Sequence, residues 1–137
     1  MASDLTNRIQ WKDDYSVGVP ELDEQHKGLI NLINRLTEEG HRSSVVGDTL
    51  DALDRYAREH FGAEEALLRA CGDQHLEEHA KQHRAFEEWL DAIKQIYRFA
   101  TTPDPFADTV NAFLRNWLIN HILKTDMAYK PLVAGRS

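Results

Sequence analysis

Cysteine is almost absent from this sequence of 137 residues, since Cys71 is the only one. A single cysteine forms no internal disulfide, so we expect a reducing compartment and interpret Cys71 as a small apolar side chain near a helix end. No apolar run approaches the ~20 residues that span a bilayer, and the segment MASDLTNRIQ at the start lacks the apolar core of a signal peptide. We therefore expect a cytoplasmic protein with no membrane partner.

An excess of positive charge is also missing. Sixteen Lys and Arg residues stand against 23 Asp and Glu residues, which gives a net charge of -7. This balance, without any basic stripe, argues against nucleic acid and anionic membranes as partners. The hydrophobic fraction of 42% and the charged fraction of 28% are those of an ordinary soluble domain with one core. We expect a soluble monomer.

Strand-like alternation, internal repeats and low-complexity segments are absent as well. Apolar residues instead recur at helical spacing in four stretches. The stretches run from Pro20 to about Gly40, from Ser43 or Ser44 to Gly72, from Asp73 to Tyr97, and from Asp104 and Pro105 to a point before Pro131. Short loops between helices of this length predict antiparallel neighbours. The expected fold is all-α, an antiparallel up-down-up-down four-helix bundle.

The segment before the first helix has no helical periodicity. It does carry Trp11, Tyr15 and Val17, so we expect an ordered N-terminal arm that lies against the bundle. The sequence thus divides into an arm over residues 1–19, a bundle over residues 20–130 and a C-terminal tail over residues 131–137.

Polar side chains occupy core-facing positions of these helices. His60, Glu64, His79 and His83 stand at positions of the second and third helices that Leu would normally fill. No Lys or Arg shares these positions, and an ionised carboxylate is costly to bury without a partner. A cation is therefore expected between the helices. Residues four apart lie on one helix face within ~6 Å of each other, so each pair brings two ligands to one place.

Three more residues complete the pattern. His26 lies on the apolar face of the first helix and His121 on that of the last. Asp126 follows His121 by five residues, which on an ideal α-helix rotates it by about 140° from His121. Spacing alone therefore does not pair the two residues. A carboxylate near a helix end can nevertheless bridge two metals from the side. Alone, each pattern is more typical of a solvated face or a core histidine. Together they predict a dinuclear site made by His26, His60, Glu64, His79, His83, His121 and Asp126.

The ligand types narrow the choice of metal. Five imidazoles and two carboxylates exceed what one tetrahedral zinc ion takes, and they differ from the all-oxygen ligands of magnesium or calcium. The mixture suits iron, while manganese, cobalt and zinc stay open. None of the candidate ligands stands in the paired ExxH motif of ferritin-like di-iron enzymes. Fewer anionic ligands favour binding oxygen as a reducible ligand over building a strongly oxidising intermediate.

Four segments carry these ligands: VGVPELDEQHKGLINLIN, HFGAEEALL, HLEEHAKQHRAF and NWLINHILKTDMAY. Through them the chain resembles the hemerythrin family, in particular the single-domain bacteriohemerythrins, from about Trp11 to Tyr129. The resemblance implies two non-heme iron ions, bridged by Glu64, Asp126 and an oxo or hydroxo group. It places one iron on His79, His83 and His121 and the other on His26 and His60. The second iron then keeps an open position for dioxygen.

The resemblance also implies a dry, closed pocket over that position. Five apolar residues within four positions of a ligand are the candidates for lining it: Leu29, Phe61, Trp117, Leu118 and Ile122. All five fit ordinary core packing equally well. Tyr129 either reaches the site or packs at the helix end, and His41 and His75 are interpreted as solvated loop histidines.

The function expected from this resemblance is reversible dioxygen binding for storage, delivery or sensing. Sensing in the family works through an attached signalling domain, which this sequence lacks, so storage or delivery is favoured, with a redox or oxygen-consuming protein as a candidate partner. The alternative is an enzyme, a di-iron oxidase, peroxidase or nitric-oxide handling protein. The ligand set argues against it, and we expect no enzyme. A third possibility is an interaction module that folds when it binds iron.

Overall fold

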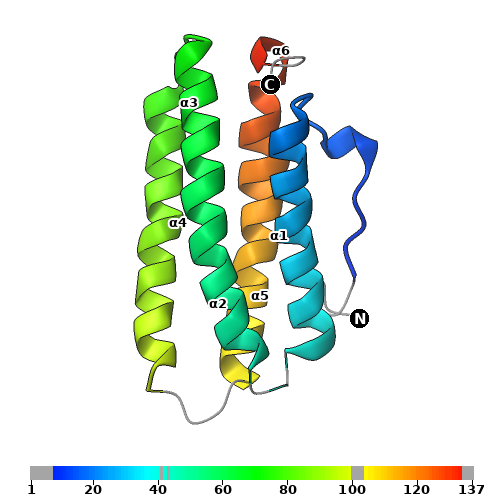
Figure 1. The fold of residues 1–137 in the computed structure, drawn as a ribbon, viewed down its shortest axis with the longest axis vertical. Coiled ribbons are helices and arrows are strands. Elements are labelled where there is room, and N and C mark those ends of the chain that lie inside the picture. Colours follow the sequence, from blue (N-terminus) through cyan, green and yellow to red (C-terminus); the bar gives the residue numbers. More distant parts are fainter. Residues whose placement is uncertain (1–7, 41, 43, 100–103, 134–137) are drawn as a thin grey trace.

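Four antiparallel rods of helix form the molecule (Figure 1). The computed structural model describes residues 8–40, 42, 44–99 and 104–133. The rods are α1 (Pro20–Glu39); α2 (Val45–Tyr56) with η3 (Ala57–Phe61) and α3 (Gly62–Ala70); α4 (Leu76–Tyr97); and α5 (Asp104–Trp117) with η4 (Leu118–Asp126). Two short turns flank them, η2 (Asp13–Tyr15) and α6 (Lys130–Val133). The predicted all-α up-down-up-down bundle is confirmed.

Glycine and proline set several of the helix ends. Pro20 opens α1, where its missing N–H costs no hydrogen bond. Gly40 closes it, and a Cβ there would come within 2.5 Å of the Leu36 carbonyl oxygen. Gly72 follows α3 with φ +71°, the left-handed conformation that glycine adopts without strain. The turn after Gly72 continues through His75, so α4 begins at Leu76, later than the cap predicted at Asp73.

Two segments depart from α-helical geometry. The periodicity of the sequence predicts unbroken α-helices, yet η3 and η4 are π-helical. Hydrogen bonds from i to i+5 widen the turn there, so residues five apart come to the same side of the helix. His60 lies in η3, and His121 and Asp126 lie in η4. The wider turns therefore fall where candidate ligands stand.

A polar layer separates two apolar clusters in the core. The larger cluster contains Leu29, Phe61 and Ile122, and the smaller contains Leu22, Leu68 and Tyr129. Three rods each carry a candidate ligand between a residue of the larger cluster and a residue of the smaller one. These ligands are His26 on the first rod, Glu64 on the second and Asp126 on the fourth. Burying one large apolar side chain contributes about 1.5–3 kcal/mol. The two clusters thus hold the bundle together on both sides of the polar layer.

The N-terminal arm runs beside α1 (Figure 1). Asn34 brackets the backbone of Ile9, accepting from its N–H at 2.7 Å and donating to its carbonyl at 2.8 Å. Val17 is fully buried, and its N–H donates to Asp23 at 2.9 Å. The expected ordered arm is confirmed for the residues that the structure describes. The division at residues 19 and 130 stays a prediction, and Val133 beyond it is buried in the smaller cluster.

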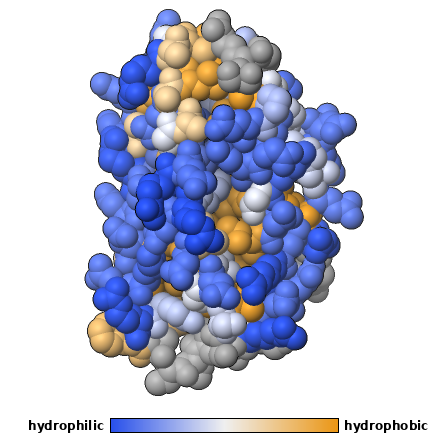
Figure 2. Space-filling model, in the orientation of Figure 1, coloured by the Kyte–Doolittle hydropathy of each residue, from blue (hydrophilic) through white to orange (hydrophobic). Residues whose placement is uncertain are grey.

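Hydrophilic side chains cover most of the face drawn in Figure 2, with hydrophobic ones visible between the helices. Within the described ranges, no helix combines the length and apolar character that a membrane span requires. Cys71 is half-buried against the smaller apolar cluster.

Candidate metal centre

The seven predicted ligand side chains meet in the polar layer. Each of the seven residues is at most 3% exposed. All four rods contribute: His26 from α1, His60 from η3, Glu64 from α3, His79 and His83 from α4, and His121 and Asp126 from η4. The structure thus brings together every residue of the predicted site.

Glu64 divides its two oxygens between two groups of histidines. Oε1 lies 2.6 Å from His79 Nε2, 2.9 Å from His83 Nε2 and 3.8 Å from His121 Nε2. Oε2 lies 3.5 Å from His60 Nε2 and 4.0 Å from His26 Nε2. One oxygen of this carboxylate therefore faces three imidazoles, and the other oxygen faces two.

Asp126 repeats this division from the opposite rod. Its Oδ1 lies 2.9 Å from His79 Nε2 and 3.1 Å from His121 Nε2, and its Oδ2 lies 3.3 Å from His26 Nε2. The contact with His121 corrects the expectation from ideal α-helical rotation, because η4 is π-helical and brings residues five apart together. Both carboxylates thus span the same two groups of histidines.

The geometry fits two cations. The ligand atoms of Glu64, His79, His83 and His121 lie within 4.8 Å of one another, and so do those of His26, His60, Glu64 and Asp126. We call the first group the three-histidine half and the second the two-histidine half. Glu64 belongs to both halves, and Asp126 touches both.

Hydrogen bonding inside the layer is incomplete. Among the described residues, neither carboxylate oxygen of Asp126 accepts a hydrogen bond of good geometry, although imidazole nitrogens lie close to both. His26 Nε2 and His60 Nε2 are 3.1 Å apart. Buried carboxylate oxygens without donors are uncommon in proteins. Cations between the carboxylates and the imidazoles would satisfy these atoms, so the residues present fit a metal centre.

Three acceptors outside the layer orient the histidines. His60 Nδ1 donates to Gln25 Oε1 at 2.5 Å, and His121 Nδ1 donates to Gln82 Oε1 at 2.5 Å. His83 Nδ1 likewise donates to Glu65 Oε2 at 2.7 Å. A proton held on Nδ1 leaves the lone pair of Nε2 directed at the centre.

These acceptors were not among the predicted site residues, although the sequence carries a signal for them. Gln25, Gln82 and Glu65 each stand one position from a candidate ligand. One position along a helix turns a side chain toward the neighbouring rod, where it can reach another rod's histidine.

Tyr129 reaches the site. Its hydroxyl donates to Glu64 Oε2 at 2.7 Å. Burial, followed by the neighbouring carboxylates, raises the pKa of Tyr129 far above its usual value, so the hydroxyl keeps its proton. Of the two interpretations of Tyr129, the structure supports contact with the site.

The charges of the layer are strongly coupled. Burial lowers the pKa of His79, but the contacts with Asp126 and Glu64 outweigh it and raise the value to about 10. Burial raises the pKa of Asp126, as does Glu64, yet contacts with histidines lower it to about 2. Burial lowers the pKa of His60. The two carboxylates therefore stay ionised and attract positive charge, whether from protons or from metal ions.

Aromatic rings cover one side of the centre. Phe61 stacks on His83 and Trp117 on His121, each with ring centroids 3.9 Å apart. Tyr56 stacks on His60 at 5.0 Å. Tyr56 was not among the predicted site residues, although its place four residues before His60 puts it on the same helix face.

The five residues predicted to line an oxygen pocket are all buried in the larger apolar cluster: Leu29, Phe61, Trp117, Leu118 and Ile122. Their role in binding oxygen remains a prediction.

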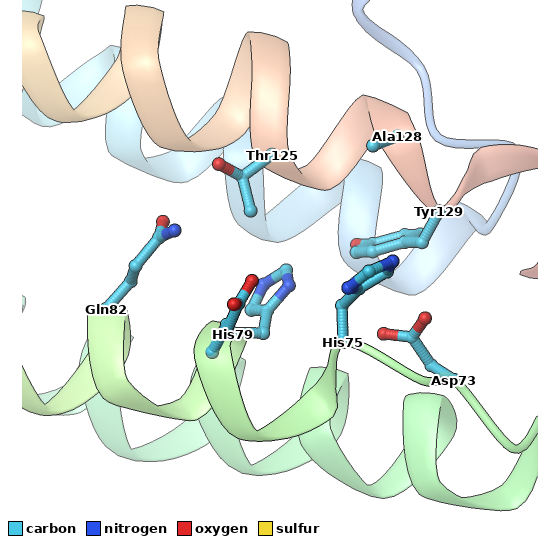
Figure 3. A pocket seen from close by; sticks show the side chains of 8 residues that line it. Asp73, His75, His79, Gln82, Thr125, Ala128 and Tyr129 are labelled. Carbon is cyan, nitrogen blue, oxygen red and sulfur yellow. The ribbon is translucent and has the colours of Figure 1, made fainter.

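A surface pocket of about 270 Å³ lies on the outer side of His79. Figure 3 shows His79, Gln82 and His75 projecting from one side of it, with Thr125 and Tyr129 on the opposite side. His75 is exposed, as predicted, whereas His41 lies outside the described residues.

Known proteins are similar to this chain in both sequence and fold. The family described as hemerythrin HHE cation binding domain matches residues 17–133. Bacteriohemerythrin of Pseudomonas aeruginosa strain LESB58 is 31% identical over 127 residues, covering 91% of this chain and 81% of that protein. Myohemerythrin of Theromyzon tessulatum is 30% identical over 130 residues, covering 95% and 98%. A crystal structure of wild-type hemerythrin aligns with a TM-score of 0.78 and 26% identity over 93% of this chain and 98% of that one. The chain belongs to the hemerythrin family.

Proposed function

We propose that this chain binds dioxygen reversibly at a non-heme di-iron centre. The observation that supports it most directly is the division of both Glu64 and Asp126 between two groups of histidines. A carboxylate with one oxygen toward each group can bridge two ions. Membership in the hemerythrin family supports iron as the metal and dioxygen as the ligand.

In this proposal each half holds one iron. The three-histidine half would use His79, His83 and His121, and the two-histidine half would use His26 and His60. Glu64 and Asp126 would bridge the ions together with an oxo or hydroxo group. The two-histidine half offers one imidazole nitrogen fewer, so an ion there would have fewer protein ligands and could accept dioxygen.

The bound iron ions would supply the electrons and the coordination position that dioxygen needs. The protein side chains orient the ligands and surround the site. Gln25, Glu65 and Gln82 hold three imidazoles in place through their Nδ1 protons. Tyr129 keeps its proton and fixes the orientation of Glu64. Leu29 and Ile122 are fully buried in the larger apolar cluster and would exclude water from the layer.

The decisive experiment is anaerobic loading of the purified chain with ferrous iron, followed by cycles of oxygen addition and removal. We expect two irons per chain and a visible charge-transfer band that forms with oxygen and disappears without it. One iron per chain, or no such band, would contradict the proposal.

The same experiment tests the alternative of a di-iron oxidase, peroxidase or nitric-oxide handling enzyme. An enzyme would lose the band irreversibly and turn over peroxide, whereas we expect binding without turnover. We further propose a cytoplasmic monomer, with a redox or oxygen-consuming protein as partner. Limited proteolysis of metal-free and loaded protein tests the interaction-module alternative, because an oxygen carrier should keep its outline without metal.

A further inference from the structure

Two buried hydrogen-bond donors near the centre lie close to each other, yet neither has a hydrogen-bond partner of good geometry among the described residues. They are the hydroxyl of Tyr56 and the indole N–H of Trp117. Buried polar groups in proteins are nearly always paired, so an unpaired donor calls for an explanation. Two of them beside a ligand-binding centre suggest that their acceptor comes from outside the chain.

The two donors stand over the two halves of the centre. Tyr56 stacks on His60 with ring planes 17° apart, and Trp117 stacks on His121 with planes 12° apart. Both rings pack against Phe61 with centroid distances of 5.7 Å, and both also contact Phe86. The donors thus share one aromatic wall above the metal-binding layer.

The Tyr56 hydroxyl lies close to the Trp117 indole and near the carboxylates of Asp126 and Glu64, since all three groups act on it. The hydroxyl and the indole N–H are neighbours without forming a hydrogen bond of good geometry. An acceptor that enters beside them can therefore take both hydrogen bonds.

Solvent reaches the outer side of this wall. A surface pocket of about 260 Å³ is lined by Gln25, Arg55, Tyr56 and His60, among others. A Cβ added at Gly28, which also borders this pocket, would meet no atom within 4 Å. The pocket thus borders the two-histidine half at His60, on the side where Tyr56 and Arg55 stand.

We propose that Tyr56 and Trp117 determine which small ligands bind at the metal centre, favouring ligands that carry negative charge. The inference rests on the proposed di-iron function. An apolar wall alone would accept neutral dioxygen without distinguishing it from other small molecules. Hydrogen bonds to a charged acceptor are stronger than those to a neutral one, so two donors stabilise an anion most.

Azide is the probe for the test. In oxidised, iron-loaded protein, Tyr56→Phe removes the hydroxyl and keeps the ring, and Trp117→Phe removes the indole N–H and keeps an aromatic side chain. We expect each to weaken azide binding about 10- to 100-fold, the loss typical of one hydrogen bond to a charged group. Tyr15→Phe, in the N-terminal arm, is the matched control and should bind azide as the unaltered chain does.

Two further measurements separate a ligand role from a structural one. Iron content should stay at two per chain in Tyr56→Phe, and the metal-free variant should melt at the same or a higher temperature, since no internal hydrogen bond is lost. Equal azide affinity with two irons bound would overturn the inference, as would a lower melting temperature or lost iron in this variant. Failure of the unaltered chain to bind two irons would overturn the proposed function itself, and the inference with it.

Discussion

The two halves of the metal centre differ in how completely the protein surrounds them. In the three-histidine half, His83 and His121 each donate Nδ1–H to an acceptor and carry a stacked aromatic ring. In the two-histidine half, only His60 has such an acceptor, and His26 Nδ1 has none among the described residues. The three-histidine half thus has more protein contacts around its imidazoles, and under the proposed function the two-histidine half is the one that would take the external ligand. Four predictions test this difference.

The largest effect is expected from Glu64→Ala. Glu64 faces every histidine of the centre, so its loss removes a ligand from both halves and leaves five buried imidazoles beside a single carboxylate. Iron content after anaerobic loading should fall from two to less than one per chain. Glu78→Ala, at an exposed position of α4, serves as the control and should retain two.

His60→Ala and His83→Ala should differ from each other. Without His60 one imidazole remains in the two-histidine half, and we expect that half to lose its ion and leave one iron per chain. Without His83 the other half keeps two imidazoles and the bridging carboxylates, so it should still load at higher iron concentration. Iron titrations of both variants check this, and equal losses would remove the distinction between the halves.

Gln25→Leu and Gln82→Leu remove one orienting acceptor from each half. Loss of such an acceptor typically lowers metal affinity by about 10- to 100-fold. We expect the larger effect from Gln25→Leu, because its half has no other acceptor for a ring Nδ1 in the described chain. Competition with a chelator of known affinity measures both, and a larger loss in Gln82→Leu would contradict the comparison.

The smallest effect concerns pH. In the metal-free centre the pKa of His79 is raised to about 10, so this imidazole is protonated at neutral pH and a metal ion must displace its proton. Each unit by which the pH is lowered between 9 and 7 should therefore weaken metal binding to the three-histidine half by about tenfold, because one proton must leave His79 for each ion bound. Asp126, with its pKa lowered to about 2, adds no pH dependence in this range. Proton release on metal addition to weakly buffered protein gives an independent measurement.

Much of the fold could be predicted from periodicity alone. The rod over Leu76–Tyr97 was predicted from Asp73 to Tyr97, with the correct end and a start that is too early, because His79, His83, Phe86, Leu90 and Ile93 repeat at three and four and all are buried. The seven candidate ligands, which meet in the polar layer, could be selected from the sequence because a histidine or carboxylate among leucines requires a partner in the core.

Other features depend on contacts that no local pattern records. The local pattern gives no sign of the π-helical turns of η3 and η4, so ideal α-helical rotation misplaced Asp126 relative to His121. Gln25 and Gln82 could not be placed at the site from the sequence, since their partners lie 35 and 39 positions away. The sequence does not distinguish Tyr56 from other half-buried aromatic residues, and its stacking on the ring of His60 appears only in the structure.

The widened turn of η4 has a consequence for the length of the chain. Deleting one residue between His121 and Asp126 would leave them four apart, the spacing of an ordinary α-helix and of His60 and Glu64. Everything downstream would then rotate by roughly 100°. Tyr129 would lose its hydrogen bond to Glu64, and Val133 would leave the smaller apolar cluster. The additional residue thus keeps the ligands and the C-terminal turn in phase.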